Sequence, residues 1–255
     1  RRQRQMCIRD RVWVWRRPKV GIISTGDELV APGGQMELGK VFDSNATVLG
    51  HAVEELGCEP VHFGIVPDEE SSIETVLQEG LELDFVLISG GTSKGEGDLN
   101  YRVFEKYNNP GILVHGVALK PGKPLCLAIL AGTPAAILPG FPTSATFTFS
   151  KFIAPVLRAM AGRLPEPTTH VKANLPVRLN SEKGRTEFNL VHLVRNDSGF
   201  SAYSTGKGSG SITGFARADG FMEIPRNTEM VEVDEEVRIC LLYTSPSPRD
   251  ATLSR

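Results

Sequence analysis

The sequence is poor in cysteine and aromatic residues and has no long apolar run. Its 255 residues include four cysteines and two tryptophans, and aromatic side chains make up 7%. Cys58 and Cys126 stand far apart in apolar surroundings, so we expect buried, reduced thiols instead of a disulfide, a zinc site or a nucleophile. No stretch approaches the roughly 20 apolar residues of a membrane-spanning helix. The sequence also lacks a nucleophile elbow, a Walker lysine motif and a dinucleotide-binding fingerprint.

Both ends of the chain resemble translated sequencing adapter. One inverted DNA element could encode both Met6–Asp10 and Cys240–Thr244, and we expect residues 1–11 and 240–255 to be adapter artefact. Without their seven arginines and two aspartates, 21 basic side chains face 28 acidic ones, a net charge of −7 in place of −2. This acidic balance argues against a nucleic-acid partner. With no apolar segment to engage a membrane, the default expectation is a cytoplasmic protein.

Residues 12–163 alternate short apolar runs with amphipathic segments. We expect helices from Ser44 and Asp68, which could cap them, and from near Ser144 to about Met160. Strands alternating with helices predict an α/β domain with a mostly parallel sheet in three layers. The expected strands are Val20–Ser24, Pro60–Val66, Asp84–Ile88, Ile112–Val117, Leu125–Leu130 and Ala135–Leu138.

Residues 168–239 have a different character and follow a linker at Leu164–Pro167. Apolar residues alternate with polar ones from Val171 to Leu179, which is typical of a half-buried antiparallel strand. We expect Arg185–Val194 to form its hairpin partner. Glycine and serine turns with short strands continue to Ile239, so this part is predicted to be a small all-β barrel or sandwich.

A glycine-rich loop, Ser89–Asp98, directly follows the apolar strand Asp84–Ile88. Glycines allow backbone N–H groups to turn toward an anion, and a helix beginning near Asp98 would add its positive end. The carboxylates of the loop could hold a cation that accompanies the anion. Taken alone, the loop could equally be a strand-to-helix turn without a ligand.

Three further polar segments follow predicted parallel strands. They are Thr25–Glu28, Asp68, and Pro139–Ser144, and the carboxyl ends of parallel strands meet at one edge of a sheet. Lys120 and Lys123, in a segment stiffened by prolines, could supply cations to the same place. Each segment alone could be a turn, a helix cap or a rigid loop. Together they predict a site for a phosphorylated ligand with an associated metal.

Four motifs resemble those of the molybdopterin molybdenumtransferases, of the MoeA and gephyrin E-domain type. They are Thr25-Gly26-Asp27-Glu28-Leu29, the Ser89–Asp98 loop, Lys120-Pro121-Gly122-Lys123-Pro124 and Leu138-Pro139-Gly140-x-Pro142, in the family's order and spacing. A looser resemblance continues through Gly208–Ile212 and Ala216–Phe221. The resemblance implies insertion of molybdate into adenylylated molybdopterin with Mg²⁺, which releases AMP and molybdenum cofactor.

The resemblance also implies roles for individual residues. The functional acids would be Asp27, Glu28, Asp68 and Asp98, with Glu28 and Asp98 as metal ligands. The residues that hold phosphate or pterin would be Thr25, Gly26, Ser89, Gly90, Gly91, Ser93, Gly95, Lys120, Lys123, Pro139, Gly140, Pro142 and Ser144. It further implies a homodimer in the full-length protein and an encounter with the adenylyltransferase of the same pathway.

Two departures from the family pattern affect these expectations. Phe141 replaces a small polar residue, which changes the expected pterin contacts and resembles a subfamily fused to a periplasmic-binding-protein-like domain. The family's N-terminal segments, which complete the site from a dimer partner, are missing from this sequence, so we expect the chain alone to be inactive. The alternatives are a molybdopterin adenylyltransferase of the same α/β fold and a non-catalytic, gephyrin-like scaffold.

Overall fold

A six-stranded sheet organises the first half of the protein. The computed structural model describes residues 13–90, 99–165, 168–197, 199–206 and 212–242. In the sheet order β4-β1-β5-β9-β8-β6, the first four strands are mutually parallel, β8 runs antiparallel to β9, and β6 antiparallel to β8. The strands are β1 (Lys19–Thr25), β4 (Glu59–Val66), β5 (Phe85–Gly90), β6 (Gly111–His115), β8 (Cys126–Leu130) and β9 (Thr133–Leu138). A separate short pair, β2 (Leu29–Val30) and β3 (Val41–Phe42), follows β1.

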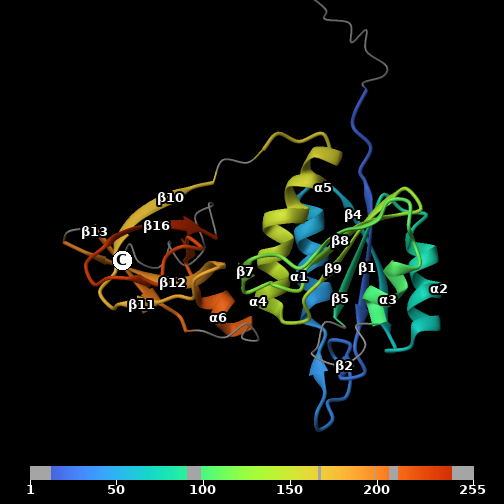
Figure 1. Ribbon diagram of the computed structural model, residues 1–255, viewed down its shortest axis with the longest axis horizontal. Helices are drawn as coiled ribbons and strands as arrows, with labels where there is room; N and C mark the ends of the chain where they lie inside the picture. The colour runs from blue at the N-terminus through green and yellow to red at the C-terminus, as the bar shows by residue number, and fades with distance from the viewer. Residues whose placement is uncertain (1–12, 91–98, 166–167, 198, 207–211, 243–255) are drawn as a thin grey trace, which may run out of the picture.

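Helices cover both faces of this sheet, as Figure 1 shows. One face carries α1 (Ser44–Glu55), α4 (Pro142–Thr148) and α5 (Ala154–Met160), and the other carries α2 (Glu70–Gly80) and α3 (Leu99–Glu105). The helix expected near Ser144–Met160 contains a π-helical turn, η1 (Phe149–Ile153), between α4 and α5. The predicted three-layer α/β fold is confirmed.

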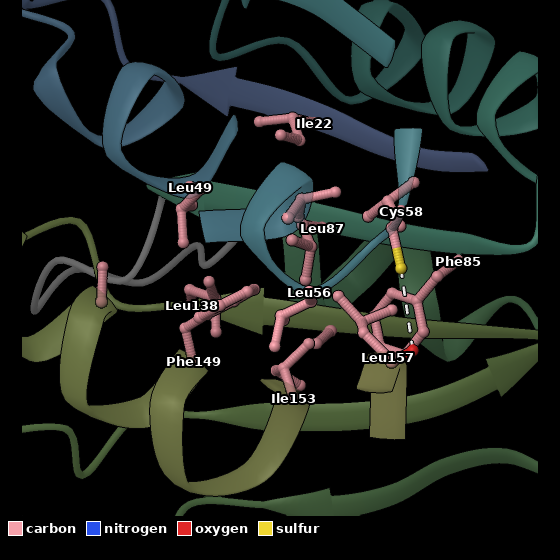
Figure 2. Packing of buried hydrophobic residues seen from close by; sticks show 14 of the residues in the cluster. Ile22, Leu49, Leu56, Cys58, Phe85, Leu87, Leu138, Phe149, Ile153 and Leu157 are labelled. Atoms are coloured by element: carbon pink, nitrogen blue, oxygen red, sulfur yellow. Dashed lines mark hydrogen bonds between the residues drawn. The ribbon is translucent and has the colours of Figure 1, made fainter. Parts of the chain in front are cut away.

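Alternating strand residues build the two apolar cores. In β1, Val20 and Ile22 pack toward α1 and α5, whereas Ile23 packs toward α2 and α3. β5 is buried along its whole length because helices cover both of its faces. Burying each large apolar side chain stabilises the fold by about 1.5–3 kcal/mol. Figure 2 shows the α1 and α5 side of this packing around Leu87 and Leu157.

The two central cysteines are buried thiols, as predicted. Cys58 and Cys126 are both free and buried. The Cys58 thiol lies 3.7 Å from the carbonyl oxygen of Leu157, and burial raises the pKa of this thiol above its ordinary value. Both cysteines therefore belong to the packing of the sheet.

In two helices the N-terminal capping position lies one residue away from the expected one. Asp43, not Ser44, caps α1, because its carboxylate reaches the backbone N–H of Ala46 at 3.0 Å. At α2 the capping position belongs to Glu69, whose side chain makes no capping bond. The prediction that Asp68 caps this helix is therefore wrong. Its backbone N–H instead donates to Asp27 Oδ1 at 3.2 Å.

The second half of the chain forms a barrel-like sheet. Its order is β13-β10-β16-β14-β12-β7, and an added β13–β12 pairing closes the first five strands into a ring, with the short β7 (Leu119–Lys120) attached to β12 outside it. Its strands are β10 (His170–Asn174), β12 (Thr186–Asn196), β13 (Gly199–Ser204), β14 (Gly220–Ile224) and β16 (Glu236–Leu241). The separate pair β11 (Leu179–Asn180) and β15 (Met230–Val231) and the short helix α6 (Ile212–Arg217) complete this part.

The expected hairpin between Val171–Leu179 and Arg185–Val194 is wrong. β10 pairs with β16 and β13, whereas β12 pairs with β13 and β14. Alternating polarity identifies a half-buried strand but does not specify which neighbour it pairs with. β16 also continues past Ile239 to Leu241. Because strands pair through their backbones, residues of any origin could extend this strand, and its length does not test where the adapter begins. The adapter boundary at residue 240 therefore stays a prediction.

One strand and a cluster of phenylalanines join the two halves. β7 (Leu119–Lys120) comes from the α/β part but pairs with the start of β12 in the barrel. Phe147 of α4 stacks on Phe188 of β12 with ring centroids 5.0 Å apart and also meets Phe221 edge-on. These contacts place the side chains of α4 and β12 face to face at the junction of the two halves. Aromatic contacts of this kind add to the free energy gained by burial.

Candidate functional site

The carboxyl ends of four parallel strands meet at one edge of the sheet. The register pairs Thr25 with both Val66 and Gly90, and Ser89 with Leu138. The segments that follow these strands therefore start side by side, as the sequence predicted.

Two buried asparagines tie these segments together. The Asn45 amide donates at 2.8 Å both to Ser89 Oγ and to the carbonyl oxygen of Gly140. The Asn100 amide donates to Thr25 Oγ1 at 2.9 Å and to the carbonyl oxygen of Gly90 at 3.1 Å. Sequence reasoning missed both residues. The available signal was a polar residue on the inner face of a helix next to a motif, because a buried amide must find hydrogen-bond partners.

Gly90 allows the ends of β1 and β5 to approach closely. Its φ of +122° lies in a region that favours glycine, and a Cβ there would stand 2.0 Å from the carbonyl oxygen of Thr25. Gly140 passes nearby, since a Cβ on it would lie 3.6 Å from the Cα of Gly90. These glycines bring three motif backbones together at the edge.

Three carboxylates gather beside this edge, at the ends of β1 and β4. Asp27 and Glu28 are exposed, and Asp68 is half-buried. Burial raises the pKa of Asp68, the nearby charges of Asp27 and Glu28 raise it further, and a hydrogen bond from the Asp27 backbone opposes them. One cation already lies beside the cluster, because the Lys40 ammonium group donates to the carbonyl oxygen of Asp27 at 2.5 Å.

Replacing Asp68 by asparagine should raise the thermal midpoint of this chain near neutral pH. A carboxyl whose pKa is higher in the folded than in the unfolded state stabilises the fold while it is protonated. This stabilisation is complete at a pH below the unfolded pKa, ordinarily 3.8, and is lost as the pH rises through the folded pKa. Because asparagine does not ionise, Asp68→Asn avoids this loss. The gain in thermal midpoint should disappear as the pH falls below the ordinary aspartate range.

Asp84→Asn is the control of opposite sign. The hydrogen bond from Arg16 lowers the pKa of Asp84, so the ionised form stabilises the fold above the unfolded pKa. Near neutral pH this variant should be less stable than the parent, and the difference between the two should shrink as the pH falls. Equal behaviour of the two variants would contradict the electrostatic account of Asp68.

The predicted lysines lie at a cavity of about 290 Å³ between the two halves. Lys120 is half-buried, and its ammonium group lies 3.3 Å from Glu187 and 3.2 Å from Glu182. Lys123 is exposed on the wall, and Ser144 is buried on the first turn of α4. The lining residues are Leu119, Lys120, Pro121, Gly122, Lys123, Pro124, Thr143, Ser144, Arg185, Glu187, Phe188, Asn189, Leu190 and Gly206.

Arg185 and Asn189 were not foreseen as site residues. Both line the cavity from the barrel, and the Asn189 amide oxygen is buried with no hydrogen-bond partner in the described structure. The linear sequence places them some 40 residues from the Pro139–Ser144 motif. The one available signal was Arg185 next to Gly184, which alone is typical of any exposed turn.

Some predicted site residues do not come together, and others cannot be placed. None of Asp27, Glu28 and Asp68 lines the cavity that holds the lysines. Within the described ranges, no group of three or more His, Cys, Asp or Glu side chains is arranged to hold a metal ion. Gly91, Ser93, Gly95 and Asp98 lie outside the described residues.

Comparisons with known proteins match both halves of the chain. Residues 21–159 match the family described as a probable molybdopterin binding domain, and residues 172–242 match the MoeA C-terminal region, domain IV. The chain belongs to the MoeA-type family. The MoeA-type chain is 31% identical over 229 residues to the molybdopterin molybdenumtransferase of Haemophilus influenzae, covering 88% of this chain and 56% of that protein. Its identity to the Nostoc enzyme is 32%, covering 91% of this chain and 54% of that protein.

A solved structure agrees with this assignment. The MoeA protein of Pyrococcus horikoshii superposes with a TM-score of 0.77 at 35% identity, over 90% of this chain and 56% of that one. The MoeA-type chain therefore spans about half the length of the relatives it matches. Among its described helices, none has the length and apolar character that a membrane crossing requires.

Proposed function

We propose that this chain is the α/β and domain IV part of a molybdopterin molybdenumtransferase, which inserts molybdate into adenylylated molybdopterin and releases AMP and molybdenum cofactor. The observation that carries the proposal is the meeting of three motif segments and the Asp68 segment at one sheet edge, with carboxylates on one side and the cavity lined by the fourth motif nearby. The substrate carries a pterin dithiolene and a pyrophosphate-linked adenylate, so it requires cationic groups for its phosphates and carboxylates for the associated metal.

The cavity would bind the anionic part of the substrate. Lys120, Lys123 and Arg185 line it, and phosphate oxygens are good partners for ammonium and guanidinium groups. Thr143 and Ser144, on its α4 side, offer hydroxyl groups. The cavity is large enough for a phosphate and part of the pterin, and the rest of the ligand would extend along the edge past Pro139, Gly140 and Pro142.

The carboxylates would act on the other end of the substrate. We assign Asp27, Glu28 and Asp68, together with Asp98, to positioning molybdate and the attacking water. Thr25, Gly26 and the Ser89–Gly95 segment would hold the substrate beside them. No carboxylate is proposed as a covalent nucleophile, since water can cleave the phosphoanhydride bond directly, which releases AMP and leaves the terminal phosphate on molybdopterin, while the dithiolene binds molybdenum.

Magnesium is proposed here from the chemistry of the carboxylate donors, and not from an arranged metal site among the described residues. Mg²⁺ prefers carboxylate oxygens and keeps several waters, and the carboxylates of Asp27 and Glu28 lie close enough to Asp68 for their charges to add to the effect of burial on its pKa. Glu28 and Asp98 are the proposed ligands. When bound, Mg²⁺ would neutralise negative charge where the adenylate phosphate leaves.

The test is an assay of the full-length protein with adenylylated molybdopterin. Molybdate-dependent release of AMP supports the proposal. ATP-dependent formation of adenylylated molybdopterin would instead identify an adenylyltransferase, and peptide binding with neither activity would identify a scaffold. The attached barrel argues against the adenylyltransferase, because the domain IV match covers residues 172–242.

The remaining expectations stay part of this proposal. The full-length protein is proposed to be a cytoplasmic homodimer that receives its substrate from the adenylyltransferase of the pathway. Phe141 is 62% exposed at the start of α4, where it is placed to touch a ligand that follows the edge. A complete reading frame beyond Ile239 would test the periplasmic-binding-protein-like domain.

A further inference from the structure

Glu182 joins Lys120 and Arg185, two of the three cations that line the cavity, which come from opposite halves of the protein. It lies between β11 and β12, and one carboxylate oxygen is 3.2 Å from the ammonium nitrogen of Lys120. The other oxygen is 2.6 Å from the Arg185 guanidinium. Glu182 is not part of the cavity wall, whereas both of its cationic partners are. The carboxylate therefore holds the two groups that would grip an anion in the cavity.

We propose that Lys120 and Arg185 form a phosphate subsite and that Glu182 is an internal competitor, which a phosphate group of the substrate must displace. The proposal rests on the proposed function only for the identity of the natural ligand. Glu182 is then a specificity residue, because a monoanion binds Lys120 and Arg185 too weakly to displace its carboxylate, whereas a dianion with several oxygens binds them strongly enough.

The charges around the subsite explain why Glu182, and not Glu187, is the displaceable partner. Glu187 is buried, its carboxylate accepts from Ser181 Oγ at 3.0 Å, and the β7–β12 register fixes it opposite Lys120. Glu187 thus permanently offsets one positive charge. Glu182 offsets the second, so its departure leaves a net charge of +1 from Lys120, Arg185 and Glu187, to which Lys123 on the cavity wall adds another positive charge.

Glu182 is also exposed to solvent, unlike Glu187. Its side chain is 55% exposed, and the turn after it contains Gly184 at a φ of +93°. Exposed ion pairs contribute only about 0–1 kcal/mol, since solvent screens them and the side chains lose freedom. A phosphate brings more charge and more acceptor oxygens than a carboxylate, and charge-assisted bonds to arginine are stronger when bidentate.

The experiment measures the binding of inorganic pyrophosphate and of AMP to the chain by calorimetry at low salt. Glu182→Gln should bind pyrophosphate on the order of fivefold more tightly, the equivalent of one exposed ion pair. The matched control is Glu229→Gln, which removes the 2.6 Å partner of Lys183 on the neighbouring loop, away from the cavity, and should leave affinity unchanged. In the Arg185→Gln background, Glu182→Gln should give a smaller gain.

Unchanged or weaker pyrophosphate binding by Glu182→Gln, with a thermal midpoint close to that of the parent, would overturn the proposal. Glu182 would then hold Lys120 and Arg185 in place instead of competing for them. The gain should also shrink at high ionic strength, because the interaction is between charges. Pyrophosphate binding requires no molybdate insertion, so failure of the competition and failure of the proposed function are separate results.

Discussion

Molybdate-dependent AMP release by the full-length protein should fall about 100-fold when Glu28 is replaced by glutamine, and similarly for Asp27→Asn. Groups that stabilise charge in a preorganised site contribute factors of about 10² to 10³ to turnover. Asp27 and Glu28 are exposed at the end of β1, where their negative charges act on Asp68. Each substitution removes one charge but keeps nearly the same shape, so the loss measures electrostatics and not packing.

Glu79→Gln is the matched control for this experiment. Glu79 is an exposed carboxylate at the far end of α2, away from the sheet edge where that helix begins. Its removal should leave AMP release within twofold of the parent. If Glu28→Gln and Asp98→Asn both kept full activity, the assignment of these acids to the site would be wrong. Unchanged urea midpoints would establish that the variants remain folded.

Gly90→Ala should destabilise this chain by roughly 3 kcal/mol or more. A non-glycine residue at a strongly positive φ costs about 1–3 kcal/mol, and forcing atoms into a filled space adds about 1–3 kcal/mol. Both effects operate here, because φ is +122° and the added Cβ would stand 2.0 Å from the backbone oxygen of Thr25. β1 and β5 would have to separate at the edge that carries the site.

Gly39→Ala separates the two contributions. Gly39 also has a positive φ, +84°, but a Cβ there would have no atom within 4 Å. Its replacement should cost only about 1–2 kcal/mol, the conformational part of the effect. Urea unfolding of both variants gives the comparison. Equal free energies of unfolding would mean that the close approach of Thr25 and Gly90 contributes nothing.

The differences between prediction and structure have identifiable physical causes. Asp68 has the right chemistry for a helix cap, but its backbone bonds to Asp27, so a contact between distant strands outweighed a local preference. Asn45 and Asn100 lie within helices, where sequence shows a polar residue but not the partner that it reaches across the sheet. Arg185 enters the cavity only because β12 pairs with β7 from the other half.

The sequence by itself determined the layers of the fold, the strand ends at which the motifs lie and the edge at which they meet. These properties follow from periodic burial and from the common direction of parallel strands, both of which are local or nearly so. Only the tertiary structure decided that Lys120 and Arg185 face one cavity, that Glu182 joins them, and that the carboxylates gather apart from it. Such contacts depend on how the barrel pairs with the α/β part, and the pairing of strands far apart in the chain has no local signal.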